Sequence, residues 1–327
     1  MIAVTGAPLS KGKLCIVVPC HNEEESIPVL FKRMKEVEPS LACWLSCPVE
    51  YVLVNDGSKD RTLSLMRELH KDDSRVHYLS FSRNFGKEAT LEAGLQKAVD
   101  LGADFIADMD ADLQDPPELL SEMFSELDAG HDVAAAYRTT RNGEPPIRSW
   151  FARRFYGLIN GISDVQMKDG ARDFRLMRRR VVVSLLSLPE VERFSKGIFQ
   201  WVGYDTAWIA YENIEREHGQ TNWSFWSLLR YAVSGFVAFS TAPLEIISAL
   251  GVATFAFALL FLLVVFLRAL AFGDPVAGWP SMMCAILMLG GANLLGVGLV
   301  GLYLSKVYAE VKRRPLYLLA EVDGECV

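Results

Sequence analysis

The sequence predicts an α/β fold in which a mostly parallel, doubly wound sheet is followed by two membrane-spanning helices. Three observations lead to this prediction. From residue 13 onward, short apolar runs typical of buried strands alternate with amphipathic helical segments. Polar residues follow several of these runs, where the carboxyl edge of a parallel sheet would lie. Two apolar runs long enough to cross a bilayer then occupy the C-terminal region.

Five apolar runs supply the predicted strands, after a loose tail at residues 1–12. Segments with helical periodicity lie between them, and this alternation is typical of parallel neighbouring strands. We expect the resulting domain to occupy residues 13–222. No Gly-x-Gly-x-x-Gly or Walker sequence follows a predicted strand, so neither of the usual phosphate cradles is expected. The predicted strands are residues 13–19, 51–54, 76–81, 103–107 and 132–137.

An acidic stretch, Asp108 to Pro117, follows the fourth predicted strand. Asp110 and Asp112 alternate along an extended backbone, and with Gln114 they offer oxygen ligands to a hard divalent cation. Such a cation also binds phosphate oxygens, which makes a nucleotide diphosphate the natural partner. Acidic residues near a helix start can instead cap the helix. Capping could explain Asp115, but not three carboxylates at two-residue spacing before the prolines.

Two apolar runs predict membrane spans within residues 243–307. Ile246 to Leu267 is uninterrupted, and Met282 to Leu304 contains only Asn293 as a strongly polar residue. Each is long enough to cross a hydrocarbon core of about 30 Å. Buried helices of a soluble core are the alternative, but apolar runs in such helices are typically shorter than these.

Basic residues near the ends of these runs predict the orientation. Arg230 precedes the first run and four Lys or Arg residues follow the second, whereas Arg268 in the connection is offset by Asp274. We therefore expect a multi-pass protein of the cell (inner or plasma) membrane with both termini in the cytoplasm. The start of the chain lacks the features of a signal peptide, so the large domain should also be cytoplasmic, as should a tail at residues 308–327.

A cationic segment lies within an otherwise acidic chain. Residues 138–180 contain eleven Lys and Arg against four Asp and Glu, which favours anionic lipid headgroups as a partner. Residues 147–162 are aromatic and basic at helical spacing, typical of a helix at a membrane interface, although a core-facing helix with a solvated basic face is the alternative. Residues 223–240 predict a juxtamembrane amphipathic helix. No nucleic-acid-binding module is recognisable, so no nucleic acid partner is expected.

Several separated motifs resemble the family 2 glycosyltransferases of GT-A fold, which have a Rossmann-like domain. Within that family the chain is similar to the polyprenyl-phosphate glycosyltransferases, a group that includes dolichol-phosphate mannose synthase. Residues 172–177 and 193–197, with the two spans, most resemble the GtrB-type bactoprenol glucosyltransferases. The resemblance covers about residues 13–307. The motifs that carry it are Val17-Val18-Pro19, Asn22-Glu23-Glu24, Val54 to Asp60 and Asp110 to Pro117.

The resemblance implies a donor site at the predicted sheet edge. Asp56 is expected to contact the uracil of a UDP-sugar, with Pro19 and Glu23 beside the nucleoside. Lys87 is expected to reach the diphosphate or the sugar, and Asp110 the ribose or the sugar.

The resemblance also implies a metal site and an acceptor site. Asp112 and Gln114 are expected to coordinate Mg²⁺ or Mn²⁺ on the diphosphate. Arg138 and Arg148 correspond to arginines that hold the acceptor phosphate, and we assign Arg175 to the same site.

We include Asp110, Asp112 and Asp173 among the catalytic residues. Asp173 lies between Arg172 and Arg175, where it could orient an arginine or contact the sugar. A simple ion-pair role for Asp173 is equally compatible with the sequence.

The resemblance implies transfer of a sugar, with glucose favoured, from a UDP-sugar to a polyprenyl (undecaprenyl) phosphate. The lipid-linked monosaccharide would serve later glycan or cell-wall modification. A lipid phosphate is already anionic near neutral pH, so the reaction needs positioning and stabilisation of the leaving diphosphate rather than a strong base. We therefore predict single displacement with inversion.

Two other functions are compatible with parts of the sequence. A processive polysaccharide synthase would share the N-terminal motifs, but residues 200–204 do not match its Gln-x-x-Arg-Trp motif and two spans are too few for a channel. A non-catalytic, membrane-anchored nucleotide-binding scaffold would not need intact metal ligands. The second span carries five glycines between Gly290 and Gly301, which permit close helix packing and predict a homo-oligomer formed through these helices.

Overall fold

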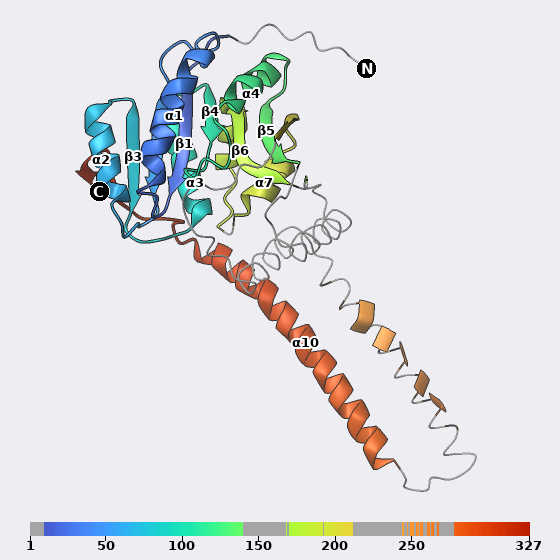
Figure 1. Ribbon diagram of the computed structural model, residues 1–327. Helices are drawn as coiled ribbons and strands as arrows, with labels where there is room; N and C mark the ends of the chain where they lie inside the picture. Colours follow the sequence, from blue (N-terminus) through green and yellow to red (C-terminus); the bar gives the residue numbers. More distant parts are fainter. Residues whose placement is uncertain are drawn as a thin grey trace.

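Nine strands form one sheet in the order β7-β5-β6-β4-β1-β2-β3-β8-β9 (Figure 1). The structure is a computed structural model of the 327-residue chain. It describes residues 10–139, 168, 170–191, 193–211 and 278–327, together with scattered positions between 244 and 267. The predicted helices at 147–162 and 223–240, and most of the predicted tail at 1–12, lie outside the described residues.

The centre of the sheet is parallel, as predicted. β1 (Leu14–Cys20) pairs with β2 (Glu50–Asn55) on one side and β4 (Phe105–Asp108) on the other, and β3 (Val76–Phe81) pairs with β2. The four strands are almost wholly buried because helices cover both faces of the sheet. These observations confirm the α/β fold.

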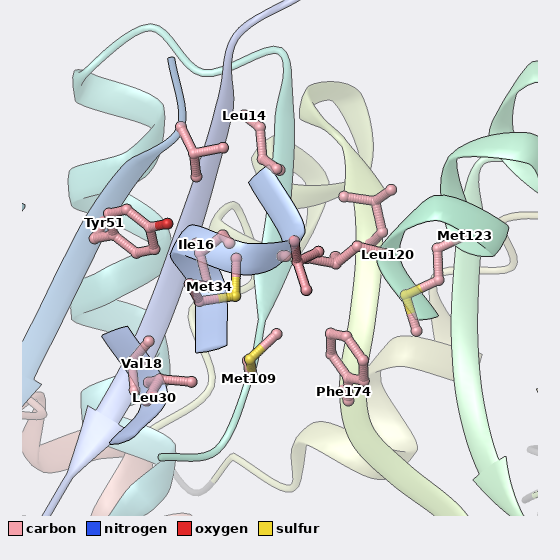
Figure 2. Close-up of a cluster of buried hydrophobic side chains, with 14 of the residues drawn as sticks. Leu14, Ile16, Val18, Leu30, Met34, Tyr51, Met109, Leu120, Met123 and Phe174 are labelled. Carbon is pink, nitrogen blue, oxygen red and sulfur yellow. The ribbon is translucent and has the colours of Figure 1, made fainter. Parts of the chain in front are cut away.

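Alternate residues of β1 enter two different layers of the core. Leu14, Ile16 and Val18 pack against α1 (Ser26–Leu41) and α4 (Leu119–Asp128), as Figure 2 shows. Cys15 and Val17 belong to the opposite layer, which includes α3 (Lys87–Asp100). This period of two is the geometry of a strand buried on both faces. α2 (Thr62–Asp72) connects β2 to β3.

The sheet becomes mixed beyond β4. β6 (Ala171–Arg178) lies antiparallel between β4 and β5 (Val133–Arg138), and β7 (Thr206–Tyr211) runs parallel to β5 at the edge. α6 (Arg179–Leu186) and α7 (Ser195–Trp201) pack on the same face as α3. The fifth predicted strand is therefore present, but it reaches β4 only through an antiparallel neighbour.

The C-terminal region combines a long helix with a return to the sheet. α10 (Trp279–Lys312) projects away from the domain, and β8 (Leu319–Val322) then pairs antiparallel with β3, followed by β9 (Glu325–Cys326) (Figure 1). Within the described residues, the segment Leu289–Lys312 of α10 is the one helix long and apolar enough to cross a membrane. The two predicted spans are therefore not both confirmed.

Candidate active site

Polar loops meet at the carboxyl edge of the parallel strands. The first contact joins the loops that follow β1 and β2, where Asn22 Oδ1 accepts a hydrogen bond from the amide of Lys59 at 2.9 Å. Pro19 lies in β1 opposite Val54 of β2. Glu23 follows in the loop, where its carboxylate accepts a hydrogen bond from Ser26 Oγ at 2.6 Å. Both predicted nucleoside-side residues therefore lie at this edge.

Asp56 fastens the loop after β3 to the end of β2. Its buried carboxylate accepts hydrogen bonds from the amides of Phe85 at 2.6 Å and Gly86 at 3.0 Å. The next residue, Gly57, has a φ of 62°, and a Cβ there would lie 2.5 Å from the carbonyl carbon of Arg83. The two loops thus pack backbone against backbone, which only glycine permits. Contact of Asp56 with a base stays a prediction.

Lys87 bridges the carboxylate of Asp110, which follows β4, and that of Asp173 in β6. Its Nζ lies 2.5 Å from Asp110 Oδ1 and 2.6 Å from Asp173 Oδ2. Desolvation alone would lower the pKa of Lys87, but the attraction of these carboxylates outweighs it and raises that pKa well above its ordinary value. Burial alone would raise the pKa of Asp173, yet Lys87, Lys196 and Arg175 hold it well below the ordinary value. Lys87 is therefore a fixed cation and Asp173 a fixed anion.

Asp108, the last residue of β4, is a fully buried carboxyl group. Neither of its carboxyl oxygens has a hydrogen-bond partner in the described part of the chain. Burial raises the pKa of Asp108 well above its ordinary value, despite the opposing attraction of Lys87. Burial consequently favours the neutral form of this carboxyl group.

The raised pKa of Asp108 makes the stability of the folded chain depend on pH. The folded pKa lies above the unfolded value of about 3.9, so the folded chain keeps a proton that the unfolded chain releases, and stability falls as pH rises between the two. Asparagine has no such dependence. We expect Asp108→Asn in detergent to melt higher than the wild type, by a margin that grows as the pH rises above the unfolded pKa of about 3.9. A difference in melting temperature that does not grow with pH would contradict this account.

The acidic stretch after β4 turns sharply and is supported by Arg172. Leu113 adopts a φ of 54°, and the amide of Gln114 donates to Asp112 Oδ1 at 3.1 Å. Arg172 donates to Gln114 Oε1 at 3.1 Å and to Asp115 Oδ1 at 3.0 Å. Asp115 therefore does not cap a helix but is a buried ion-pair partner.

The two predicted metal ligands fit a hard divalent cation in their donor chemistry. The side chains of Asp112 and Gln114 each offer an oxygen with more than one lone pair, the kind of ligand that such a cation prefers. Among the residues that the structure describes, three His, Cys, Asp or Glu side chains do not gather closely enough to hold a metal by themselves. Such a cation would complete its coordination with water and phosphate oxygens.

The comparison with protein families decides the class of this site. The model described as "Glycosyl transferase family 2" matches residues 15–186. The chain is a family 2 glycosyltransferase. The predicted family is thereby confirmed, and with it an enzyme of the transferase class.

Curated relatives match the glycosyltransferase over nearly its whole length. An uncharacterized glycosyltransferase of Synechocystis is 38% identical, over 95% of this chain and 96% of the relative. The bactoprenol glucosyl transferase of Shigella phage SfX is 39% identical, over 94% of this chain and 98% of the relative. A prophage bactoprenol glucosyl transferase homolog of Escherichia coli is also 39% identical, over 95% of this chain and 99% of the relative.

Arg175, predicted to contact the acceptor phosphate, is buried and makes its contacts within the domain. Its side chain is 2% exposed and donates to the backbone carbonyls of Asp173 at 3.1 Å and Arg172 at 3.0 Å. The guanidinium also packs over the ring of Phe199 at 3.6 Å. The register that pairs Arg175 with Asp108 places it inside the glycosyltransferase domain. Arg175 therefore supports the segment that carries Asp173, and its contact with an acceptor phosphate stays a prediction.

Arg138 and Arg148 are the other two arginines predicted to hold the acceptor phosphate. Arg138 ends β5 and is half-buried. Arg148 lies outside the described residues. Their contact with an acceptor phosphate stays a prediction.

The segment 193–197 ties α7 to α3. Arg193 forms an ion pair with Glu92 at 3.0 Å, and the amide of Ser195 donates to the carboxylate of Glu88 at 3.0 Å. Glu88 is the neighbour of Lys87 at the start of α3. This motif of the glycosyltransferase therefore fixes the helix from which Lys87 extends.

Proposed function

We propose that this glycosyltransferase is a membrane-bound, inverting enzyme that transfers glucose from UDP-glucose to a polyprenyl phosphate such as undecaprenyl phosphate. The observation that carries the proposal is the bridge from Lys87 to Asp110 and Asp173, next to Asp112 and Gln114 at the carboxyl edge. The names of the bactoprenol glucosyl transferase relatives support both the acceptor class and the sugar.

The donor would lie along the loops that follow β1, β2 and β3. Pro19, Glu23 and Asp56 border the nucleoside end, and Lys87 is held where an ammonium can meet phosphate or sugar oxygens. Asp112 and Gln114 would hold Mg²⁺ or Mn²⁺, which supplies Lewis-acid stabilisation of the leaving diphosphate.

The residues present favour a single displacement. Asp173 is held ionised, so it is a charge partner that orients Lys87 rather than a proton donor. A lipid phosphate oxygen needs no strong base to attack the anomeric carbon. Direct attack inverts that carbon, giving a β-linked product from an α-linked donor. The lipid-linked sugar would then be available to later glycan or cell-wall modification.

The acceptor and the membrane belong to the same proposal. Arg138 and Arg148 would hold the acceptor phosphate, since forked guanidinium donors match phosphate geometry. We propose two membrane spans, of which α10 is the second, and a cytoplasmic location for the catalytic domain and both termini. The glycines of α10 would allow close packing of helices from separate copies of the chain, giving a homo-oligomer.

The test is transfer of radiolabel from a panel of UDP-sugars to undecaprenyl phosphate in membranes, with and without Mn²⁺. We expect UDP-glucose to label the lipid in a metal-dependent reaction, and Asp112→Ala to abolish labelling. Asp72→Ala, at the exposed end of α2, is the matched control and should keep full activity. Lipid labelling by another UDP-sugar alone would overturn the assignment to glucose.

Two other outcomes would overturn more of the proposal. Absence of labelled lipid with every donor, from folded protein that binds UDP, would reject the acceptor class. Full activity of Asp112→Ala would reject its role in metal binding.

A further inference from the structure

The end of α10 leads directly into a segment that returns to the sheet. Arg313 takes the left-handed conformation, with a φ of 48°, where the helix ends. We call residues 313–323 the C-terminal strap. Within it, β8 pairs antiparallel with β3 through partners that include Leu79 with Val322 and Ser80 with Glu321. The strap therefore connects α10 to β3, the strand whose following loop leads to Lys87.

Ion pairs anchor the far end of the strap. Asp323 accepts hydrogen bonds from the amide of Tyr78 at 2.8 Å and from Lys97 Nζ at 2.7 Å. Glu321 is paired with Arg67, whose Nε lies 2.9 Å from Glu321 Oε1. Because these contacts hold β8 on the sheet, a change at the near end of the strap should leave the pairing in place.

The near end of the strap contacts the loop after β3. The ring of Tyr317 stacks on Phe81, with centroids 4.8 Å apart and planes at 11°. Phe81 in turn meets Phe85 edge to face, with centroids 5.8 Å apart. The amide of Ser82 donates to the carbonyl of Leu318 at 3.0 Å. Three rings therefore form a row from the strap into residues 82–86, which we call the β3–α3 loop.

This row ends at the residues that organise the site. The amides of Phe85 and Gly86 are the two donors to Asp56. Lys87 follows at once and bridges Asp110 and Asp173. A displacement of the Phe85 ring would therefore move the loop that donates hydrogen bonds to Asp56 and that precedes Lys87.

We propose that Tyr317 is a positioning residue for the nucleotide-sugar site. By stacking on Phe81, it holds the β3–α3 loop in the geometry that presents Asp56 and Lys87, and it ties that geometry to the end of α10. This proposal rests on the proposed function in one respect, namely that the ligand of the site is a nucleotide-sugar. Its alternative is that the strap simply covers the exposed edge of β3, as strands at a sheet edge are commonly covered.

The test compares Tyr317→Ala with Tyr317→Phe and Leu318→Ala in the full-length protein. Tyr317→Phe keeps the stacked ring. Leu318 is the matched control, because it is the adjacent strap residue and its side chain is 56% exposed. Two quantities are measured, namely hydrogen exchange of a peptide covering the β3–α3 loop without ligand, and KM and kcat for the UDP-sugar donor.

We expect Tyr317→Ala to speed amide exchange in the β3–α3 loop and to raise KM for the donor roughly tenfold, in keeping with one aromatic pair. The value of kcat at saturating donor should change less than KM. Tyr317→Phe and Leu318→Ala should behave as the wild type in both measurements. If Tyr317→Ala does not fold, Tyr317→Leu, which keeps apolar bulk without the ring, replaces it in the same comparison.

Unchanged loop exchange and unchanged KM in Tyr317→Ala would overturn the proposal and leave edge covering as the role of the strap. An equal effect of Leu318→Ala would overturn it as well. Hydrogen exchange needs no ligand, so it tests the positioning role even if the wild type transfers no sugar from any UDP donor, a result that counts only against the proposed function.

Discussion

Replacing Lys87 with methionine is expected to lower kcat for sugar transfer by about 10²–10³-fold, the usual effect of removing one preorganised group that stabilises developing charge. Lys87 is the one residue that touches both Asp110 and Asp173 among the contacts of the described site. Without its ammonium, two carboxylates face each other with no cation between them. In the proposed mechanism, the leaving diphosphate also loses a positive partner. Steady-state transfer from a UDP-sugar to undecaprenyl phosphate measures the effect.

Two variants separate loss of this charge from general damage. Lys87→Arg keeps the positive charge and should retain more activity than Lys87→Met. Lys71→Met removes an exposed lysine at the end of α2 and should match the wild type. If Lys87→Met transferred sugar at the wild-type rate, the bridge would have no part in the reaction.

The parts of the site that the sequence predicted depend on local patterns. Parallel strands share a carboxyl edge, so polar residues directly after buried runs could be placed together without knowing the pairing partners. The positions of Asp56, Lys87 and Asp110 near this edge follow from that pattern. The roles expected of them come from the family resemblance.

The parts that escaped prediction depend on distant pairs. Arg172 meets Asp115 across 57 residues, and Tyr211 meets the same carboxylate across 96. β8 follows α10 in the chain and pairs with β3, which lies more than 200 residues earlier. Its four residues are too few to show the alternation of apolar and polar side chains that marks a strand. No local spacing encodes such contacts.

Arg175 shows what a motif alone leaves out. An arginine near an aspartate that is predicted to be catalytic is a reasonable phosphate ligand by residue type. The antiparallel register of β6 with β4 determines instead that Arg175 faces the interior. That register could not be read from the sequence, because β6 follows a long connection and enters the sheet between two strands that precede it in the chain.

Replacing Arg172 with methionine is expected to destabilise the folded domain by about 3–5 kcal/mol, the usual cost of removing one partner of a buried ion pair. Asp115 is 1% exposed and receives hydrogen bonds from Arg172 and from the Tyr211 hydroxyl. Methionine would leave a buried carboxylate without its cation. Gln114 would also lose the donor that orients its side-chain oxygen, so metal-dependent activity should weaken as well.

Denaturant or thermal unfolding in a mild detergent measures this loss, and two comparisons test its cause. Arg33→Met breaks an ion pair with Glu118 in which the side chains are 52% and 47% exposed, so it should cost no more than about 1 kcal/mol. Adding Asp115→Asn to Arg172→Met removes the buried charge and should restore part of the stability, because the cost of Arg172→Met arises from the unpaired carboxylate rather than from lost packing. A double variant no more stable than Arg172→Met would show that packing of the arginine stem, and not its charge, holds the acidic stretch in place.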